Sequence, residues 1–201
     1  AVLSWQSERP ALEVDMSGAA DGSVLVSGLK IRHYSPSVAQ NYGVYVHNPT
    51  RKVKFLNCDV ASSSGSGIGV EGGNVTVFSC TIHDCKNHGV LYVGSGATLS
   101  MTSCTFDDNY AYSHIMHAYG GAIYAASSSV LYLDECDFND NWVDSGVYYP
   151  SHGGAIVVEG TATLLDCSFT GNLNYQAPQS PSARGGAIYT SGTLYCPGCT
   201  F

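Results

Sequence analysis

The sequence predicts an all-β fold, a right-handed single-stranded parallel β-helix of about seven coils whose last coil is incomplete. The first observation is a stretch centred on Cys136, with apolar side chains at Leu131, Leu133, Cys136 and Phe138 and an asparagine at Asn141. The same pattern recurs along the chain, with the residue equivalent to Cys136 at positions 29 (a leucine), 58, 80, 104, 167 and 199. Self-similarity of this kind is the signature of a repeat architecture and outranks local propensity.

The second observation is a glycine segment that precedes each later copy of this pattern. It reads Gly-Gly-Ala-Ile at 120–123, 153–156 and 185–188, and weaker forms begin at Gly43, Gly67 and Gly89. Two short segments of alternating polarity, separated by a tight turn and recurring at intervals of roughly 20 to 35 residues, are too short for helices and indicate successive strands of one coil. Stacked coils then align the apolar positions in continuous inward columns, which form the core.

The chain is expected to form one domain over residues 1–201, with short coils over 11–88 and coils with long loops over 89–201. Leu12, Val14 and Met16 alternate and predict the first strand. In the later coils the added length lies between the asparagine and the next Gly-Gly pair, so the long loops leave the same corner and should stack into one raised wall. Aromatic residues of these loops are candidate interaction residues: Tyr110, Tyr112, Trp142, Tyr148, Tyr149 and Tyr175.

Charge is sparse and predominantly acidic. Charged residues make up 12% of the 201 residues, the formal net charge is −8 at pH 7, and Arg184 is the only lysine or arginine after Lys86. Such a chain does not attract nucleic acid, whose phosphates need a basic surface, and anionic membranes would repel its acidic half. Because no run is long and apolar enough to cross a bilayer, membrane insertion is not expected either.

Paired motifs give the chain a family resemblance. Phe-Asp-Asp-Asn at 106–109, Phe-Asn-Asp-Asn at 138–141 and Phe-Thr-Gly-Asn at 169–172 each precede a Gly-Gly-Ala-Ile segment. This pairing resembles the repeat of the chlamydial polymorphic outer membrane proteins, and similar repeats occur in β-helical surface proteins of algae and other protists. The resemblance implies a parallel β-helix with an extracellular or cell-surface location and an adhesive role.

Cysteine occurs in nearly every coil. Cys196-Pro-Gly-Cys199 suggests metal binding or redox activity, but both sulfurs fall on core positions and the partners of a metal shell are missing. We therefore interpret the thiols as small packed hydrophobes. Strands about 4.8 Å apart would also allow some pairs to oxidise, and the sequence leaves free thiols and disulfides both open. The inward column consists of Cys58, Cys80, Cys104, Cys136, Cys167 and Cys199.

Asparagines recur where the chain turns after the phenylalanine of each later coil. Asn109, Asn141 and Asn172 are expected to form a structural ladder, because a side-chain amide can bond both the backbone of a tight corner and the next asparagine. A further asparagine, Asn74, begins the sequon Asn74-Val75-Thr76 at an outward position and is a candidate for N-glycosylation in an extracellular setting.

Three aspartates precede this corner position on successive coils. Asp84, Asp108 and Asp140 should be near neighbours, and carboxylates about 5 Å apart suit either Ca²⁺ or a retaining glycosidase. No lysine or arginine is expected beside them. We therefore interpret them as solvated turn residues, and we assign no catalytic residue and no cofactor.

The expected function is structural or adhesive, extracellular and non-catalytic. A polysaccharide lyase or hydrolase of the pectate-lyase-like type is the alternative, by analogy with other β-helix proteins. Ice binding ranks third, because it rests on outward threonines such as Thr98 and Thr161, and threonine is common on exposed strands. The expected partners are glycans and copies of the same chain docked end to end, or a covalent continuation of it, since the last coil stops halfway round and leaves an open strand edge.

Overall fold

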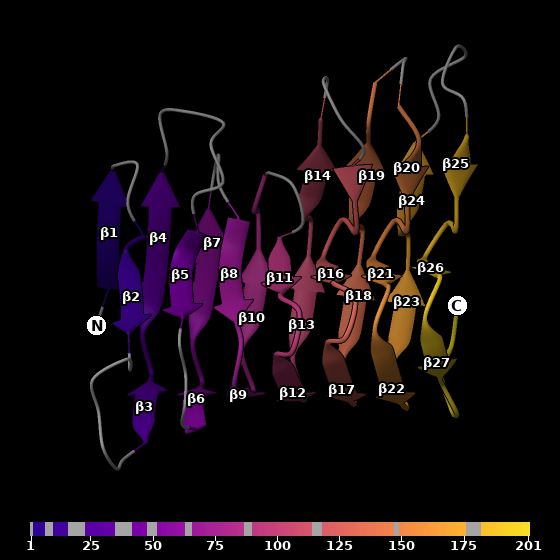
Figure 1. The fold of residues 1–201 in the computed structure, drawn as a ribbon. Coiled ribbons are helices and arrows are strands. Elements are labelled where there is room, and N and C mark those ends of the chain that lie inside the picture. The colour runs from indigo at the N-terminus through magenta and orange to yellow at the C-terminus, as the bar shows by residue number, and fades with distance from the viewer. Residues whose placement is uncertain are drawn as a thin grey trace.

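The computed structural model is a stack of β-strands (Figure 1). It describes residues 2–6, 10–15, 23–34, 42–47, 52–62, 66–86, 90–113, 118–146, 149–175 and 182–201. Within these ranges no helix is long and apolar enough to cross a membrane. Three 7-stranded parallel sheets run the length of the stack, and two 3-stranded sheets stand on its C-terminal half. Each coil contributes one strand to each long sheet, which is the architecture of a parallel β-helix.

The strands are assigned to five sheets. Sheet A consists of β1 (Val2–Gln6), β4 (Lys30–Tyr34), β7 (Asp59–Ser62), β10 (Thr81–His83), β13 (Thr105–Asp107), β18 (Asp137–Asn139) and β23 (Ser168–Thr170). Sheet B consists of β2 (Leu12–Asp15), β5 (Tyr42–His47), β8 (Ser66–Glu71), β11 (Leu91–Val93), β16 (Ile123–Ala125), β21 (Ile156–Val158) and β26 (Ile188–Thr190). Sheet C consists of β3 (Val24–Ser27), β6 (Lys52–Leu56), β9 (Asn74–Phe78), β12 (Thr98–Thr102), β17 (Val130–Asp134), β22 (Thr161–Leu165) and β27 (Thr193–Tyr195). Sheet D consists of β14 (Tyr110–Tyr112), β19 (Trp142–Asp144) and β24 (Leu173–Tyr175), and sheet E of β15 (Ala118–Tyr119), β20 (Ser151–His152) and β25 (Ala183–Arg184).

Neighbouring coils stack in register, so each inward position recurs at the same place in the next coil. In sheet C, Leu131 pairs with Leu99 of the preceding coil. In sheet A, the rings of Phe106, Phe138 and Phe169 stack with centroids 4.8 Å apart. All five side chains are buried, and burial of apolar surface is the main driving force for folding. The predicted apolar columns therefore form the core.

The pattern around Cys136 spans a corner of the coil. β17 ends at Asp134, β18 begins at Asp137, and Glu135 between them has a φ of 50°. This left-handed residue turns the chain, so the inward alternation changes phase between Leu133 and Cys136. Two strands per coil were expected from the sequence, and that expectation was wrong because this corner divides the predicted second strand into two.

The first strand, β1, was not predicted. It pairs in register with β4 at the edge of sheet A. Leu3 pairs with the buried Ile31 of β4, but both Val2 and Leu3 are exposed at this edge of the sheet. The following strand, β2, coincides with the predicted first strand, and Val14 lies buried in the core. Met16 falls outside the described residues.

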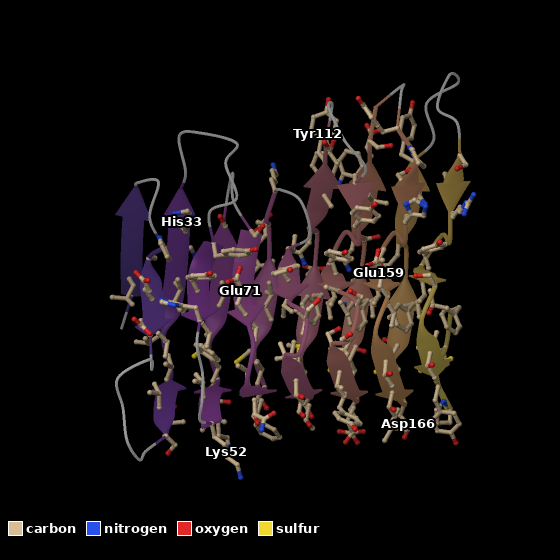
Figure 2. All side chains as sticks on the ribbon, viewed as in Figure 1. His33, Lys52, Glu71, Tyr112, Glu159 and Asp166 are labelled. Carbon is tan, nitrogen blue, oxygen red and sulfur yellow. The ribbon has the colours of Figure 1, made fainter. Side chains whose placement is uncertain are left out.

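The long loops of the later coils rise together from one corner and form what we call the raised wall, made of sheets D and E. After the ladder asparagine the chain passes through sheet D, returns through sheet E and re-enters sheet B after a Gly-Gly pair. The wall stands above the C-terminal half of the stack (Figure 1). Figure 2 shows Tyr112 on the wall and Lys52 on the opposite side of the molecule. A small apolar cluster of Ala111, Ala118 and Val143 packs inside the wall.

Candidate functional site

A hollow lies at the foot of the raised wall, where the short coils meet the long ones. Its volume is about 300 Å³, and it is lined by two carboxylates, one amine and two aromatic rings: Asp84, Lys86, Asp108, Tyr110 and Trp142. These residues come from three successive coils. Aromatic side chains combined with a few convergent polar groups are typical of a ligand-binding site.

The aromatic side of the hollow is a stack of two rings. Tyr110 begins β14 and Trp142 begins β19, and their ring centroids are 3.7 Å apart with an interplanar angle of 8°. On the other side of Tyr110 the preceding coil places Lys86, which joins Tyr110 through an isolated β-bridge. Burial raises the pKa of the Tyr110 hydroxyl, and Asp144 adds to the shift. The phenol therefore stays protonated at neutral pH and can donate a hydrogen bond.

The acidic side of the hollow lies at the corner that ends sheet A. Asp84 and Asp108 have φ values of 52° and 53°, a left-handed conformation that aspartate adopts more readily than most residues. Both side chains are exposed. The expectation that no lysine or arginine lies near the aspartate row was wrong, because Lys86 lines the same hollow as both carboxylates.

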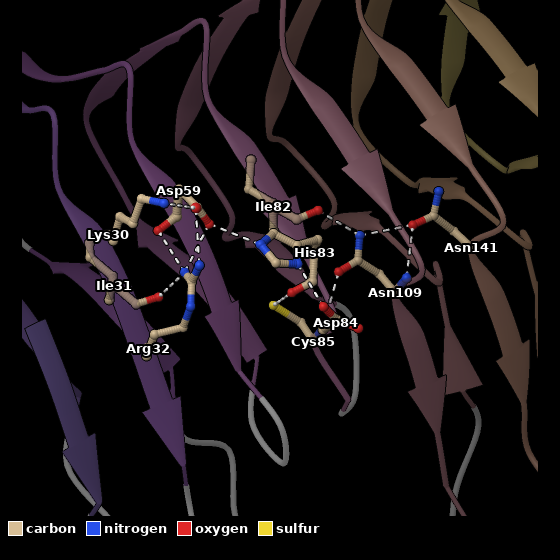
Figure 3. Close-up of polar contacts among 10 residues, drawn as sticks. All are labelled: Lys30, Ile31, Arg32, Asp59, Ile82, His83, Asp84, Cys85, Asn109 and Asn141. Atoms are coloured by element: carbon tan, nitrogen blue, oxygen red, sulfur yellow. Dashed lines mark hydrogen bonds and ion pairs between the residues drawn. The ribbon is translucent and has the colours of Figure 1, made fainter. Parts of the chain in front are cut away.

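A polar network lies on the outer face of sheet A (Figure 3). Asp59 accepts two hydrogen bonds from the Arg32 guanidinium, at 2.8 and 3.0 Å, and lies 2.9 Å from His83 Nε2. His83 Nδ1 lies 2.7 Å from Asp84 Oδ2, and Lys30 Nζ lies 3.7 Å from Asp59 Oδ2. The hydrogen bonds from Arg32 and then His83 lower the pKa of Asp59 to about 2. Asp84 thus connects this network to the hollow.

The three aspartates of the row, Asp84, Asp108 and Asp140, lie at equivalent corners of successive coils. Within the described ranges, no three histidine, cysteine, aspartate or glutamate side chains are placed to hold a metal ion. The Asp84 carboxylate contacts His83, and the Asp140 carboxylate points at the backbone of Gly171 in the next coil. Asp140 also has a positive φ, 50°, like Asp84 and Asp108. Each aspartate of the row is therefore the left-handed residue at the corner that follows its sheet A strand.

Comparison with known proteins agrees with this architecture. Residues 14–201 match the family described as a right-handed β-helix region. The chain belongs to the right-handed β-helix family. No curated protein and no solved structure matches it. This pectate-lyase-like fold is compatible with both enzymes and non-enzymes, so any functional argument rests on the site.

The asparagines of this right-handed β-helix form a continuous ladder beside the hollow. Asn109 and Asn141 are fully buried, and Asn172 is half-buried. Each side-chain amide donates to a backbone carbonyl of the preceding coil, at 2.9–3.1 Å. In the coil before Asn109, Cys85 occupies the position that the asparagines take in later coils. Its backbone N–H donates to the side-chain oxygen of Asn109 at 3.2 Å.

The cysteine column lies in the core of the β-helix, and its thiols have a role that was not anticipated from the sequence. Each buried thiol donates to the carbonyl oxygen two residues earlier, across the corner, at 3.3–3.5 Å. The side chain thus serves as a small apolar group and as a weak donor at the corner. Cys196 and Cys199 are half-buried, and the buried thiols are Cys58, Cys80, Cys85, Cys104, Cys136 and Cys167.

The other candidate residues lie apart from the hollow or at its margin. Tyr112 and Tyr175 end β14 and β24 in the raised wall, and Tyr149 accepts a hydrogen bond from Ser145 through its backbone carbonyl. Tyr148 lies outside the described residues. Asn74 begins β9 with its side chain exposed, which leaves room for a glycan.

The outer face of sheet C carries the threonine rows considered for ice binding. Thr98, Val130, Thr161 and Thr193 follow one another in register. Val130 interrupts this row, and the exposed Tyr132 interrupts the neighbouring one. The face therefore lacks a regular lattice of threonines.

A row of tyrosines on the outer face of sheet B was not anticipated from the sequence. Tyr92 and Tyr124 pair in register with ring centroids 5.8 Å apart, and Tyr119 of the raised wall stacks on Tyr124 at 5.1 Å. The Tyr124 hydroxyl donates to Glu159 at 3.0 Å. The repeat contains a pattern that could have predicted this row. In four glycine segments a tyrosine directly follows the inward apolar residue, at positions 45, 92, 124 and 189.

Proposed function

We propose that this β-helix is an extracellular structural or adhesive protein without catalytic activity, and that it binds glycans through the hollow at the foot of the raised wall. The observation that carries the proposal is the Tyr110–Trp142 stack, which borders the hollow beside two carboxylates and a lysine. A rigid aromatic surface with polar groups at its edge is suited to a ligand that is apolar on one face and hydroxylated around its rim.

A sugar ring has this character. Its C–H face packs on the Tyr110 ring, which Trp142 supports from behind at 3.7 Å, and aromatic rings contribute large contact area at small entropic cost. Its hydroxyl groups donate to the carboxylates of Asp84 and Asp108 and accept from the Lys86 ammonium. Because the carboxylates outnumber the amine, a neutral or amino sugar fits better than an acidic one.

The location is argued from the sequence as well as from the site. The paired Phe-x-x-Asn and Gly-Gly-Ala-Ile motifs resemble those of the chlamydial polymorphic outer membrane proteins, which supports a surface adhesin. The exposed Asn74 sequon fits the same setting. A stack of coils that contact only their neighbours builds a stiff rod, and such a rod can present a binding hollow along its side.

Glycan binding can be tested with a glycan array followed by titration calorimetry on the strongest hit. Tyr110→Ala should weaken binding at least about tenfold, because it removes the stacking surface. Tyr175→Ala is the matched control, since it removes an exposed tyrosine at the far edge of the same small sheet, and it should leave the affinity unchanged. Absence of binding by the unaltered chain, or equal affinity of Tyr110→Ala, would refute the proposal.

Polysaccharide cleavage is the second candidate, and one observation favours it. Asp84 and Asp108 share the hollow with Lys86, and His83 contacts Asp84 at 2.7 Å, so acid, base and cation lie together. Incubation with neutral and acidic polysaccharides, with product detection by chromatography, tests this reading. We expect no turnover. Cleavage that is lost in Asp108→Asn while glycan binding persists would establish an enzyme instead.

A further inference from the structure

We propose that the cysteine column closes into three disulfides between neighbouring coils, Cys58–Cys80, Cys104–Cys136 and Cys167–Cys199, when the chain folds in an oxidising environment. In the structure all 8 cysteines are free thiols. The proposal is independent of glycan binding, since the column lies in the core and the hollow on the surface.

The cysteines of the column stand directly over one another. The backbone N–H one residue after each cysteine donates to the carbonyl of the cysteine in the preceding coil, at 2.9–3.0 Å. Neighbouring strands lie about 4.8 Å apart, within the range of about 4.4–6.8 Å between Cα atoms that a disulfide spans. The sulfurs also reach the neighbouring coil: the backbone N–H of Cys58 donates to Cys80 Sγ at 3.2 Å, and the pKa of Cys136 is shifted by the thiols of Cys104 and Cys167 on either side.

The pairing follows from the order of the column. A thiol in a column reaches only the coil before and the coil after. Leu29 takes the position ahead of Cys58, because Asp59 N–H donates to the Leu29 carbonyl in the same way that later coils bond to their cysteines. Cys80 is therefore the single column partner of Cys58.

Cys80 and Cys136 each have a neighbour on both sides, but only one arrangement pairs all six cysteines of the column. That arrangement joins Cys58 to Cys80, Cys104 to Cys136 and Cys167 to Cys199. Cys85 and Cys196 stand in other columns, at the asparagine position and at the position of Leu164, and remain thiols.

Each bond requires the removal of two electrons, which a small disulfide RSSR of the glutathione type accepts. The thiolate of one cysteine attacks RSSR, forms the mixed disulfide Cys–S–SR and releases RSH. The thiolate of the neighbouring cysteine then attacks the cysteine sulfur of this mixed disulfide, closes the Cys–S–S–Cys bond and releases a second RSH. The two cysteine protons end on the two RSH molecules, so atoms and electrons balance.

The bonds must form while the coils assemble. Thiolates are the reacting species. In the folded core, burial raises the pKa of Cys80 to about 11 and the hydrogen bond with Cys104 raises the pKa of Cys136 to about 12, whereas the same hydrogen bond lowers the pKa of Cys104. Burial also shields the sulfurs from RSSR. A chain that folds with reduced cysteines therefore keeps them reduced, and the oxidation state of the column depends on the conditions under which the chain folded.

The test is to refold the full chain from denaturant with and without a glutathione redox buffer, alkylate it in denaturant with iodoacetamide, and map the peptides without reduction. After oxidative refolding we expect alkylation of Cys85 and Cys196 only, three linked peptide pairs, and a Tm about 5 °C or more higher per bond than that of the reduced protein. The same buffer added to the folded reduced protein should leave all 8 cysteines open to alkylation.

Two variants sharpen the test. Cys80→Ala should leave Cys58 reduced and keep the Cys104–Cys136 and Cys167–Cys199 bonds, while Cys85→Ala should keep all three. Alkylation of every cysteine after oxidative refolding of the unaltered chain, or recovery of Cys80–Cys104 and Cys136–Cys167 links in its place, would overturn the proposal. Because the unaltered chain decides the outcome alone, a variant that fails to fold does not weaken the test.

Discussion

The side chains of Asn109 and Asn141 are joined directly: the Asn109 amide donates to Asn141 Oδ1 at 2.9 Å, and the Asn109 backbone N–H donates to the same oxygen at 3.3 Å. Asn141 repeats both bonds toward Asn172. Each asparagine thus satisfies polar groups of two coils at a buried corner, which the strand ladders do not reach. Because Tyr110 and Trp142 directly follow these asparagines, the ladder also fixes the start of the aromatic stack in the hollow.

Asn141→Ala should lower the free energy of unfolding by roughly 2–4 kcal/mol. The change removes the bond from the Asn141 amide to the Phe106 carbonyl, and it takes from Asn109 the acceptor of one side-chain N–H and of its backbone N–H, leaving the Asn109 amide bonded only to the Ile82 carbonyl. Denaturant unfolding followed by circular dichroism measures the effect. Asn139→Ala, on the outward side of the same coil, should change the unfolding free energy by less than about 0.5 kcal/mol. Equal effects of the two substitutions would contradict a structural role for the ladder.

Gly154→Ala should destabilise the fold by about 3 kcal/mol, because the new Cβ has no room. At Gly154 this atom would lie 2.0 Å from the Gly186 carbonyl oxygen and 2.8 Å from the Leu173 carbonyl carbon, both parts of the backbone. Gly186 is the equivalent glycine of the last Gly-Gly pair, and a Cβ built there meets nothing within 4 Å. Gly186→Ala in this chain is thus the matched control, and its Tm should stay close to that of the unaltered protein.

The sequence predicts the fold well because the core is periodic. Each coil repeats the inward positions, so Leu131, Cys136 and Phe138 can be aligned with their counterparts by spacing alone, and the registers of the paired strands agree with that alignment. The Gly-Gly pairs mark the place where backbone of successive coils approaches too closely for a side chain. These features are local in sequence and recur, which is the condition under which pattern reasoning succeeds.

The candidate site was less predictable because it lies where the repeat changes. Lys86 enters the hollow only because the short coil ends beside the first long one, so that Lys86 bridges to Tyr110. The contact of Asp59 with His83 joins two coils through outward side chains, whose identities do not repeat. The positive φ of Asp84 was likewise not visible as a constraint, because Cys85 follows it in place of the asparagine that follows Asp108 and Asp140.

Cys136→Asp should unfold the neighbouring coils, at a cost of roughly 4 kcal/mol or more, because it places an unpaired charge in a fully buried apolar column. Tyr132→Asp is the control on the same coil, since the Tyr132 side chain points outward and is 49% exposed. Its effect should stay within about 1 kcal/mol. A melting curve for Cys136→Asp that matches the unaltered protein would show that the inward register is misassigned.

The Asp59 network should make stability depend on pH in the acid range. Arg32, and after it His83, lower the pKa of Asp59 in the folded chain to about 2, whereas an unfolded aspartate titrates near about 3.9. Between these values the unfolded chain binds more protons than the folded one, so this contribution is complete above about pH 4 and is lost as the pH falls toward 2. Because the groups are partly exposed, we expect a contribution of only about 1 kcal/mol.

Unfolding free energies measured at pH 6, 4 and 2.5 test this contribution of Asp59. Asp59→Asn should be less stable than the unaltered chain at pH 6, and the difference should shrink at pH 2.5. Asp107→Asn, which alters an exposed carboxylate on the nearby strand β13, should show a much smaller difference at every pH, and an Asp59→Asn difference that persists undiminished at pH 2.5 would rule out the charge as its cause.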